Sequence, residues 1–252
     1  MDCVRHSAKK NKRGLTNHFS LEFVDKGTSI VGWLHLSKSK RIICLIGMDG
    51  TGKTTHAIGI IDYLRKHGYK YRYVWFGSPY FFSFPFMVIC RLLGFTKTHH
   101  LANGFVFSEH LYFKNKSLSW IWPWVQFIDL MFFVGLRVYW PLKAGFTVVC
   151  DRFTPDNLVE LMVDIRDEKL HKRLVGQLLL KMKPEGCNIF LLDVNESFAF
   201  QRKQDLPNLD YLVQRRRKYR SIASELRIPI INAERSFWVV NNEIIGNINL
   251  DA

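Results

Sequence analysis

Acidic residues are scarce in this chain of 252 residues: 22 Asp and Glu stand against 36 Lys and Arg, which gives a formal net charge of +14. A balance this basic favours anionic partners, such as nucleotides, nucleic acid or acidic membrane surfaces, and charge alone does not separate them. Hydrophobic residues make up 48% of the chain, which excludes global disorder and is enough for one large α/β domain.

Cysteine is also sparse, and the five cysteines do not have the spacing of metal ligands. They are Cys3, Cys44, Cys90, Cys150 and Cys187. Cys44 and Cys150 fall in apolar runs, so we expect buried thiols. This usage suits a reducing compartment, and we predict a cytoplasmic protein.

Long uninterrupted apolar runs are missing too. Residues 1–20 contain none, so we expect no signal peptide. The run 118–140 is long enough to suggest a membrane span, but it is interrupted by Pro123, Gln126, Asp129 and Arg137. We therefore predict no transmembrane span and a buried helix over a sheet. Peripheral attachment to a membrane through its tryptophans is the alternative.

The chain has no internal repeat, and we divide it into a basic N-terminal extension, 1–39, and one domain, 40–252. The extension clusters Lys9, Lys10, Lys12 and Arg13. We interpret this cluster as a flexible, solvated tail. The alternative is an arm that contacts nucleic acid or an acidic membrane.

Residues 41–55, RIICLIGMDGTGKTT, contain the pattern G-x-x-x-x-G-K-[ST] between an apolar run and a helical pattern. A loop of small residues lets backbone N–H groups point at a phosphate chain, and the helix that follows adds its positive end. Lys53 can reach the terminal phosphates, and the Thr54 hydroxyl can hold Mg²⁺. The predicted nucleotide-binding residues are Gly47, Met48, Asp49, Gly50, Thr51, Gly52, Lys53, Thr54 and Thr55.

Strand-like and helical patterns alternate after this motif, which predicts a parallel sheet with both faces covered. The expected strands are 42–46, 69–76, 145–151, 188–194 and 228–232. Residues 96–104 are predicted to be a polar connection, and the histidines nearby, His99, His100 and His110, are expected at the surface rather than in a metal site.

Two further groups are candidates for the site. Asp151 and Arg152 directly follow a buried strand, and ligands of open α/β sheets collect at the carboxyl ends of strands. Asp151 can hold the water shell of Mg²⁺ or orient an acceptor oxygen, and Arg152 can clamp a phosphate. Arg202 and the cations of 215–220 form a basic segment, from which we expect at least one to close over a transferring phosphoryl group.

The segments GMDGTGKTT, VVCDRF, LLDV and RRKYR, in this order and spacing, resemble the thymidylate kinase family of nucleoside monophosphate kinases. The resemblance implies a P-loop three-layer α/β sandwich with a five-stranded parallel sheet, helices on both faces and an arginine-bearing lid segment. It also implies ATP and Mg²⁺, a homodimer, and transfer of the γ-phosphoryl group to a nucleoside monophosphate, dTMP first.

Carried over by position, the resemblance makes Lys53, Asp151, Arg152 and Arg202 catalytic, and Thr54 and Asp151 the residues near the metal. Asp49 would take the 3′-hydroxyl of the acceptor's sugar. Some members carry a catalytic arginine in the loop, at the position where this chain has Gly50. Members without that arginine have a catalytic arginine in the lid segment instead. That difference makes Arg202 the candidate.

The acceptor half departs from the family pattern. The family's Arg-Glu-Pro, whose arginine grips the acceptor phosphate, is replaced by residues 77–79, Gly-Ser-Pro. The family's serines and its Ala-Tyr-Gln, which help to position the thymine base, are also replaced. This chain has Asp156, Asn157 and residues 159–161 at those positions. A P-loop kinase for a non-nucleotide acceptor, with Asp156 and Glu160 binding hydroxyls or an amine, is therefore one alternative. A nucleic-acid-binding ATPase is another, although Asp151 is not followed by the glutamate that typically activates water.

Overall fold

The structure, a computed structural model, describes residues 41–77, 81–100, 106–203 and 206–248. All of them belong to the unit Leu34–Ala252. The predicted extension 1–39, with its basic tail, lies outside the described residues.

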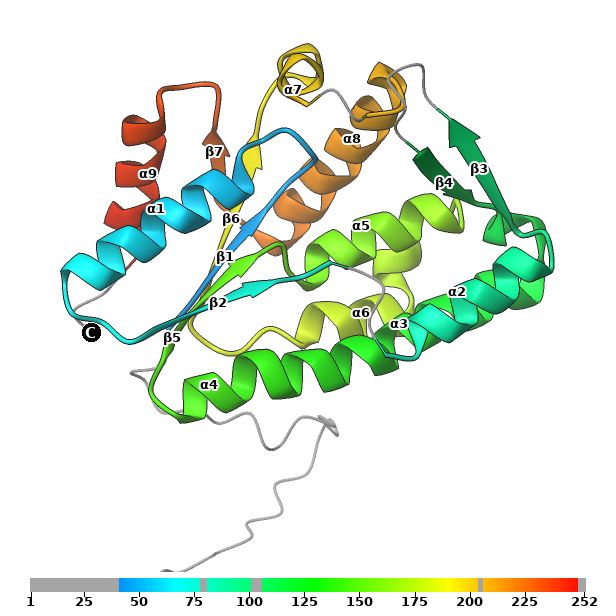
Figure 1. Cartoon of the computed structure of the whole chain (residues 1–252), viewed down its shortest axis with the longest axis horizontal. Coiled ribbons are helices and arrows are strands. Elements are labelled where there is room, and N and C mark those ends of the chain that lie inside the picture. Colours follow the sequence, from blue (N-terminus) through cyan, green and yellow to red (C-terminus); the bar gives the residue numbers. More distant parts are fainter. Residues whose placement is uncertain (1–40, 78–80, 101–105, 204–205, 249–252) are drawn as a thin grey trace, which may run out of the picture. The chain divides into compact units, whose positions relative to one another are not determined.

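Five parallel strands form one sheet among the described residues, which confirms the predicted α/β class (Figure 1). They are β1 (Ile42–Ile46), β2 (Tyr71–Trp75), β5 (Thr147–Asp151), β6 (Cys187–Asp193) and β7 (Ile230–Asn232), in the order β2-β5-β1-β6-β7. The central strand β1 is buried at every position, as a strand covered on both faces should be. Cys44 lies opposite Cys150 of β5 and Ile189 of β6.

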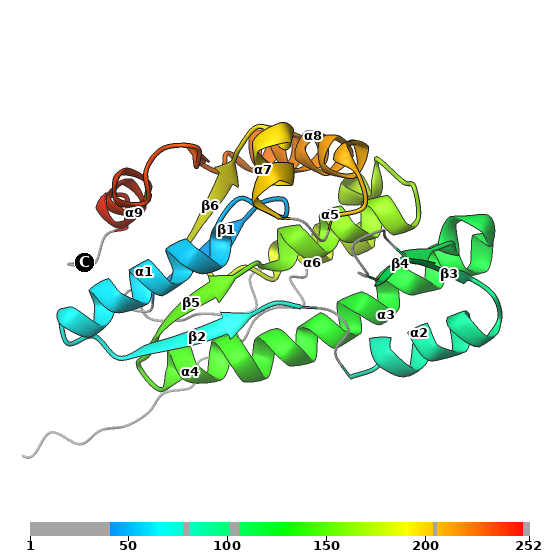
Figure 2. The same cartoon turned by 45° about the horizontal axis from the view of Figure 1, so that its top comes forward.

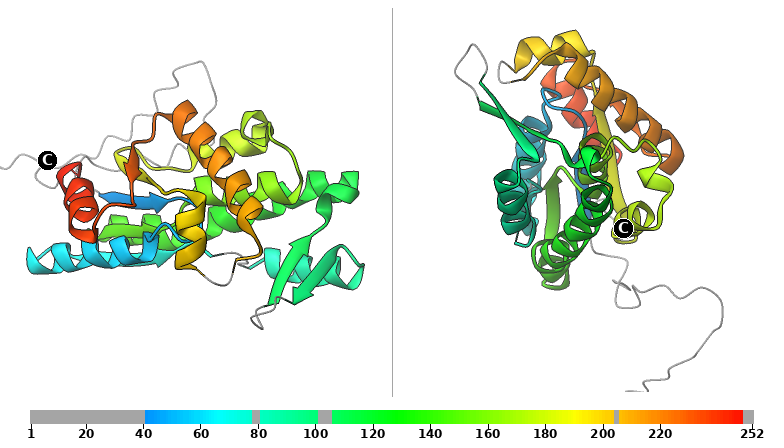
Figure 3. Two further views of the ribbon diagram at one scale, coloured as in Figure 1. Left: turned by 90° about the horizontal axis from the view of Figure 1, so that it is seen from above. Right: turned by 90° about the vertical axis from the view of Figure 1, so that its right-hand side faces the viewer.

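Helices cover both faces of this sheet, as predicted (Figures 2 and 3). One face carries α1 (Lys53–Lys66) and α9 (Phe237–Gly246). The other carries α3 (Lys116–Val134), α4 (Trp140–Lys143), α5 (Thr154–Asp164), α6 (Leu174–Lys181) and α8 (Leu209–Leu226). Each crossover helix returns the chain to the same end of the sheet, so the strand ends that carry polar residues meet at one edge.

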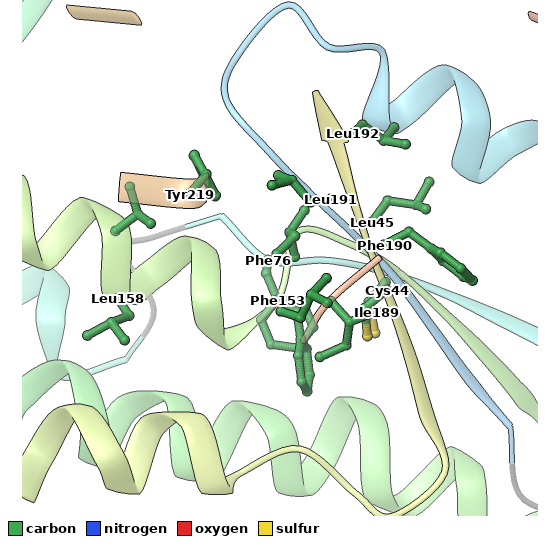
Figure 4. Close-up of a cluster of buried hydrophobic side chains, with 14 of the residues drawn as sticks. Cys44, Leu45, Phe76, Phe153, Leu158, Ile189, Phe190, Leu191, Leu192 and Tyr219 are labelled. Atoms are coloured by element: carbon green, nitrogen blue, oxygen red, sulfur yellow. The ribbon is translucent and has the colours of Figure 1, made fainter. Parts of the chain in front are cut away.

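The hydrophobic core lies on both faces of the sheet, and Figure 4 shows part of it around the strands. Phe76 and Phe153 each follow a strand, and their rings meet edge to face with centroids 5.2 Å apart. Both side chains are buried, so the two loops that leave β2 and β5 are anchored just below the polar edge. Cys44 and Cys150 are buried, as predicted.

The apolar run predicted as a helix over the sheet is a helix. It runs from Lys116 through a π-helical turn at Gly135–Tyr139 to Lys143. Among the described residues it is the one helix long and apolar enough to cross a membrane by length and composition, and 39% of its apolar window is buried. The prediction of a buried helix is therefore only half right. One side packs on the core, and the other exposes side chains such as Trp120 and Trp140.

Asp129, an acid within this apolar helix, has a structural role. Its buried carboxylate accepts hydrogen bonds from the backbone N–H groups of Phe81, Phe82 and Ser83, each at 2.9 Å. These groups open α2 (Ser83–Leu92), so the carboxylate caps that helix and complements its positive end.

The prediction of a polar connection at 96–104 was wrong. Thr96–His100 (β3) pairs antiparallel with Val106–His110 (β4) as a separate two-stranded sheet. This ribbon has polar residues on both sides, so it lacks the alternation that reveals a half-buried strand. One ring nitrogen of His99 lies 3.0 Å from a Glu109 carboxylate oxygen across the ribbon.

Candidate functional site

The candidate site lies where the carboxyl ends of β1, β5 and β2 meet. The turn 47–52 leaves β1, Arg152 leaves β5, and Tyr73 is the middle residue of β2. This is the edge at which ligands bind in open α/β sheets.

Glycine is required at two positions of the turn. Gly47 has φ +143° and Gly50 has φ +83°, which L side chains rarely adopt. A Cβ at Gly47 would lie 2.5 Å from the carbonyl oxygen of Leu192, and one at Gly50 would lie 2.6 Å from that of Ala199. Ala199 belongs to α7 (Glu196–Arg202), which packs directly on the turn. An arginine in place of Gly50 would therefore collide with α7.

Lys53, the first residue of α1, is buried and points back into the turn. Its Nζ donates to the carbonyl oxygens of Gly47 at 2.6 Å and Met48 at 2.7 Å. Burial, with the nearby charge of Arg152, lowers the pKa of Lys53 to about 8. An ammonium group so poorly compensated suits an anionic ligand, so the turn fits a phosphate chain.

Three oxygen-bearing side chains meet beside the turn. The hydroxyl of Thr54 donates to Oδ2 of Asp151 at 2.5 Å, and the hydroxyl of Tyr73 donates to the same oxygen at 2.9 Å. Mg²⁺ prefers oxygen ligands and keeps several waters, so Thr54 and Asp151 fit the predicted metal site. Among the described residues no cluster of three or more His, Cys, Asp or Glu side chains could hold a metal without such waters or a ligand.

Asp49 and Arg152, predicted for the acceptor side, are brought together. Nη2 of Arg152 lies 2.5 Å from Oδ1 of Asp49, and Nζ of Lys203 lies 3.5 Å from the same oxygen. Burial alone would raise the pKa of Asp49, but the charges of Arg152, Lys53 and Lys203 outweigh it and hold the pKa well below its ordinary value. Asp49 therefore stays ionised and can accept a hydrogen bond from a hydroxyl group. Arg152 has φ +70°, so the backbone is strained beside the site.

Arg202, predicted to close over the transferring phosphoryl group, is the last residue of α7. Its guanidinium group stacks on the ring of Phe198 and donates to the carbonyl oxygen of Ala233 at 3.4 Å, beyond the end of β7. The next residue, Lys203, reaches Asp49. In this conformation Lys203 is the cation of the segment nearest the turn.

The cations of 215–220 point in different directions around α8, as a helix requires. Arg215 binds both carboxylate oxygens of Glu160, at 3.1 and 2.6 Å. Arg216 binds both oxygens of Asp193 and one of Glu196, and Lys218 binds Glu168. These cations hold α8 to neighbouring elements, so none of these three is free to close on a phosphoryl group without breaking an ion pair.

Asp156 is a buried hub that joins the turn to α5 and α8. Its carboxylate accepts from the backbone of Gly47 at 3.3 Å and of Phe153 at 2.8 Å, and from the Tyr219 hydroxyl at 2.8 Å. Burial raises its pKa to about 6, against the opposing charges of Lys53 and Arg152. Asp156 therefore positions the turn.

This raised pKa predicts a pH dependence of stability. The folded-state pKa of Asp156, about 6, lies above the ordinary value of 3.8, so between these values the folded state binds more protons than the unfolded state. The free energy of unfolding should gain about 1 kcal/mol from this group as the pH falls from 7 to 5. Urea titrations at several pH values should reveal this slope, and Asp156→Asn should remove it while lowering stability throughout. An unchanged slope in the variant would contradict the assignment.

A cavity of about 1020 Å³ opens beside Asp49 and Arg152 and extends under the β3–β4 ribbon. Its wall carries seven carboxylates: Asp49, Glu109, Asp156, Glu160, Asp164, Glu168 and Asp210. It carries four cations: Arg152, Arg166, Arg215 and Lys218. The wall is thus acidic, in contrast to the basic chain as a whole.

Sequence reasoning missed Tyr73, Lys203, Tyr219 and the ribbon that roofs the cavity. Side chains of a strand alternate between the two faces of the sheet, so the predicted strand could have placed the Tyr73 side chain on one face. Nothing near it in the sequence indicates that Asp151 is its hydrogen-bond partner. No protein-family model matches the chain, and no curated protein matches its sequence.

Proposed function

We propose that this chain is an ATP- and Mg²⁺-dependent phosphotransferase whose donor site is of the nucleoside monophosphate kinase type, with a P-loop that holds the donor phosphates. The observation that carries the proposal is the buried Lys53 ammonium inside a glycine turn, next to the Thr54–Asp151 pair. An anion-binding turn and an oxygen-rich metal site side by side suit Mg·ATP.

In the proposed reaction Asp49 accepts a hydrogen bond from a hydroxyl group of the acceptor and so helps to align the attacking oxygen with the γ-phosphorus. That oxygen belongs to the phosphate of a nucleoside monophosphate, or to a hydroxyl group of an acceptor without a phosphate. A P–O bond forms to the acceptor and the bond to the β,γ-bridging oxygen breaks. ADP leaves with the electron pair, and an acceptor that attacks through a hydroxyl group also releases its proton to solvent. Lys53 and Arg152 lie where they can stabilise the negative charge that builds on the phosphoryl oxygens. Mg²⁺, when bound, would neutralise part of the same charge.

The resemblance names a nucleoside monophosphate, dTMP first, as acceptor, and a cytoplasmic homodimer as the working form. The residues at the family's acceptor-binding positions differ from the family pattern. This difference favours a second candidate, a kinase for an acceptor that is not a nucleotide. Both candidates share the donor site and the transfer of the γ-phosphoryl group, which goes to a phosphate oxygen in the first and to a hydroxyl oxygen in the second.

The test is ADP release from Mg·ATP by the purified full-length chain, with and without acceptors. The panel holds dTMP, dUMP, the other nucleoside monophosphates, and the matching nucleosides and sugars. We expect acceptor-stimulated ADP release, with the ³²P label of [γ-³²P]ATP recovered on the acceptor. Binding of Mg·ATP with all label released as inorganic phosphate would instead identify an ATPase.

A further inference from the structure

The four cations of the cavity wall are already engaged by the chain's own groups. Arg152 pairs with Asp49, Lys218 pairs with Glu168, and Arg215 forms its two-pronged pair with Glu160. Arg166 lies 3.7 Å over the ring centroid of Phe113. A phosphate group entering this cavity would have to break one of these pairs before gaining a partner.

The place of the family's phosphate-gripping arginine holds no cation. Gly77 stands there, and a Cβ on it would lie 1.9 Å from the ring of Trp75, which would have to move to admit a side chain. Trp75 lines the cavity, so an aromatic surface replaces the cation.

The wall is instead rich in hydrogen-bond acceptors, because seven carboxylates line it. Asp164 is one of them, and its Oδ2 accepts from Nε1 of Trp122 at 3.2 Å. Hydroxyl and amino groups can satisfy such atoms, whereas a phosphate dianion presents only acceptors and adds repulsion.

We infer that the acceptor is a polyhydroxy compound without a phosphate of its own, uncharged or carrying an amine, rather than a nucleoside monophosphate. This inference rests on the proposed phosphotransferase function and concerns only its acceptor. The acceptor hydroxyl is converted to a phosphate monoester, ATP becomes ADP, and one proton is released. The product then bears the dianion that the acidic wall disfavours, which helps it to leave.

The test compares matched pairs that differ only in a phosphate: thymidine with dTMP, cytidine with CMP, ribose with ribose 5-phosphate, and glucosamine with glucosamine 6-phosphate. ADP release is measured with each, and binding of each is measured by calorimetry with a non-hydrolysable ATP analogue present. We expect the unphosphorylated member of the productive pair to have a kcat/KM at least ~10-fold higher. A phosphorylated member that is preferred, or that binds more tightly than its partner, overturns the inference and leaves the phosphotransferase function standing.

A variant tests the wall directly. Glu160→Gln removes one charge and frees Arg215, so it should tighten dTMP binding roughly 10-fold relative to the natural chain. Asp62→Asn is the matched control, because Asp62 pairs with Arg65 on α1, does not line the cavity, and its change should be within about 2-fold. Equal dTMP affinity in all three proteins, with folding confirmed by thermal melting, would show that the wall does not select against phosphate. Turnover by Lys53→Ala at the natural rate would count against the phosphotransferase function itself.

Discussion

Lys53→Ala should lower phosphoryl transfer roughly 10³-fold or more. The ammonium group is the buried cation that sits inside the glycine turn, 2.6 Å from the Gly47 carbonyl oxygen, and no neighbour on α1 can replace it. The effect should fall mainly on kcat, because charge on the transferring group increases in the transition state.

The measurement is the rate of ³²P transfer from [γ-³²P]ATP at saturating acceptor. Lys66→Ala, an exposed lysine at the end of the same helix, is the matched control and should retain the natural rate. Thermal melting should show that Lys53→Ala still folds. The folded variant transferring phosphate within ~10-fold of the natural rate would remove Lys53 from the proposed mechanism.

Asp49→Ala should reduce kcat/KM for the acceptor about 100-fold while leaving the Kd of ATP within about 3-fold. The carboxylate is ionised, faces the cavity and holds Arg152 and Lys203 in place. Its loss removes the acceptor's hydrogen-bond partner and releases two cations toward the cavity.

Asp49→Asn keeps the size of the side chain and separates charge from shape. Asp62→Ala removes an exposed acid from α1 and should change neither parameter. Both constants come from one set of assays, ADP release against acceptor concentration and calorimetry with ATP. Weakened ATP binding with an unchanged acceptor KM would show that Asp49 serves the donor side instead.

The acidic cavity changes how the chain's basic charge is interpreted. The charge of +14 favours anionic partners in general, and the phosphate turn agrees with that. The cavity beside Asp49 and Arg152 has the opposite local sign, because most of its cations are neutralised in pairs with nearby carboxylates. Net charge therefore describes the surface but not this site.

Helix and strand positions could be predicted well where the signal is local. The apolar run at β1, the helical spacing after it and the turn residues at its ends lie within a few positions of one another, so short-range pattern is enough. The same logic failed for β3 and β4, whose residues are polar on both sides. The direction of the Arg202 side chain is not local information either, because it depends on α7 packing against the turn rather than on the position along the chain.

The sequence by itself determined the glycine turn, which is the proposed donor half of the site. Gly47 to Thr55 are consecutive, and glycine at positive φ followed by a helix start leaves few conformations open to them. Only the tertiary structure decided the proposed acceptor half. Arg152 meets Asp49 across 103 positions and Arg215 meets Glu160 across 55. Such pairs form only when separate helices and strands pack together. The sequence offers several carboxylates as a partner for each cation, and the packing determines which of them lies in contact with it.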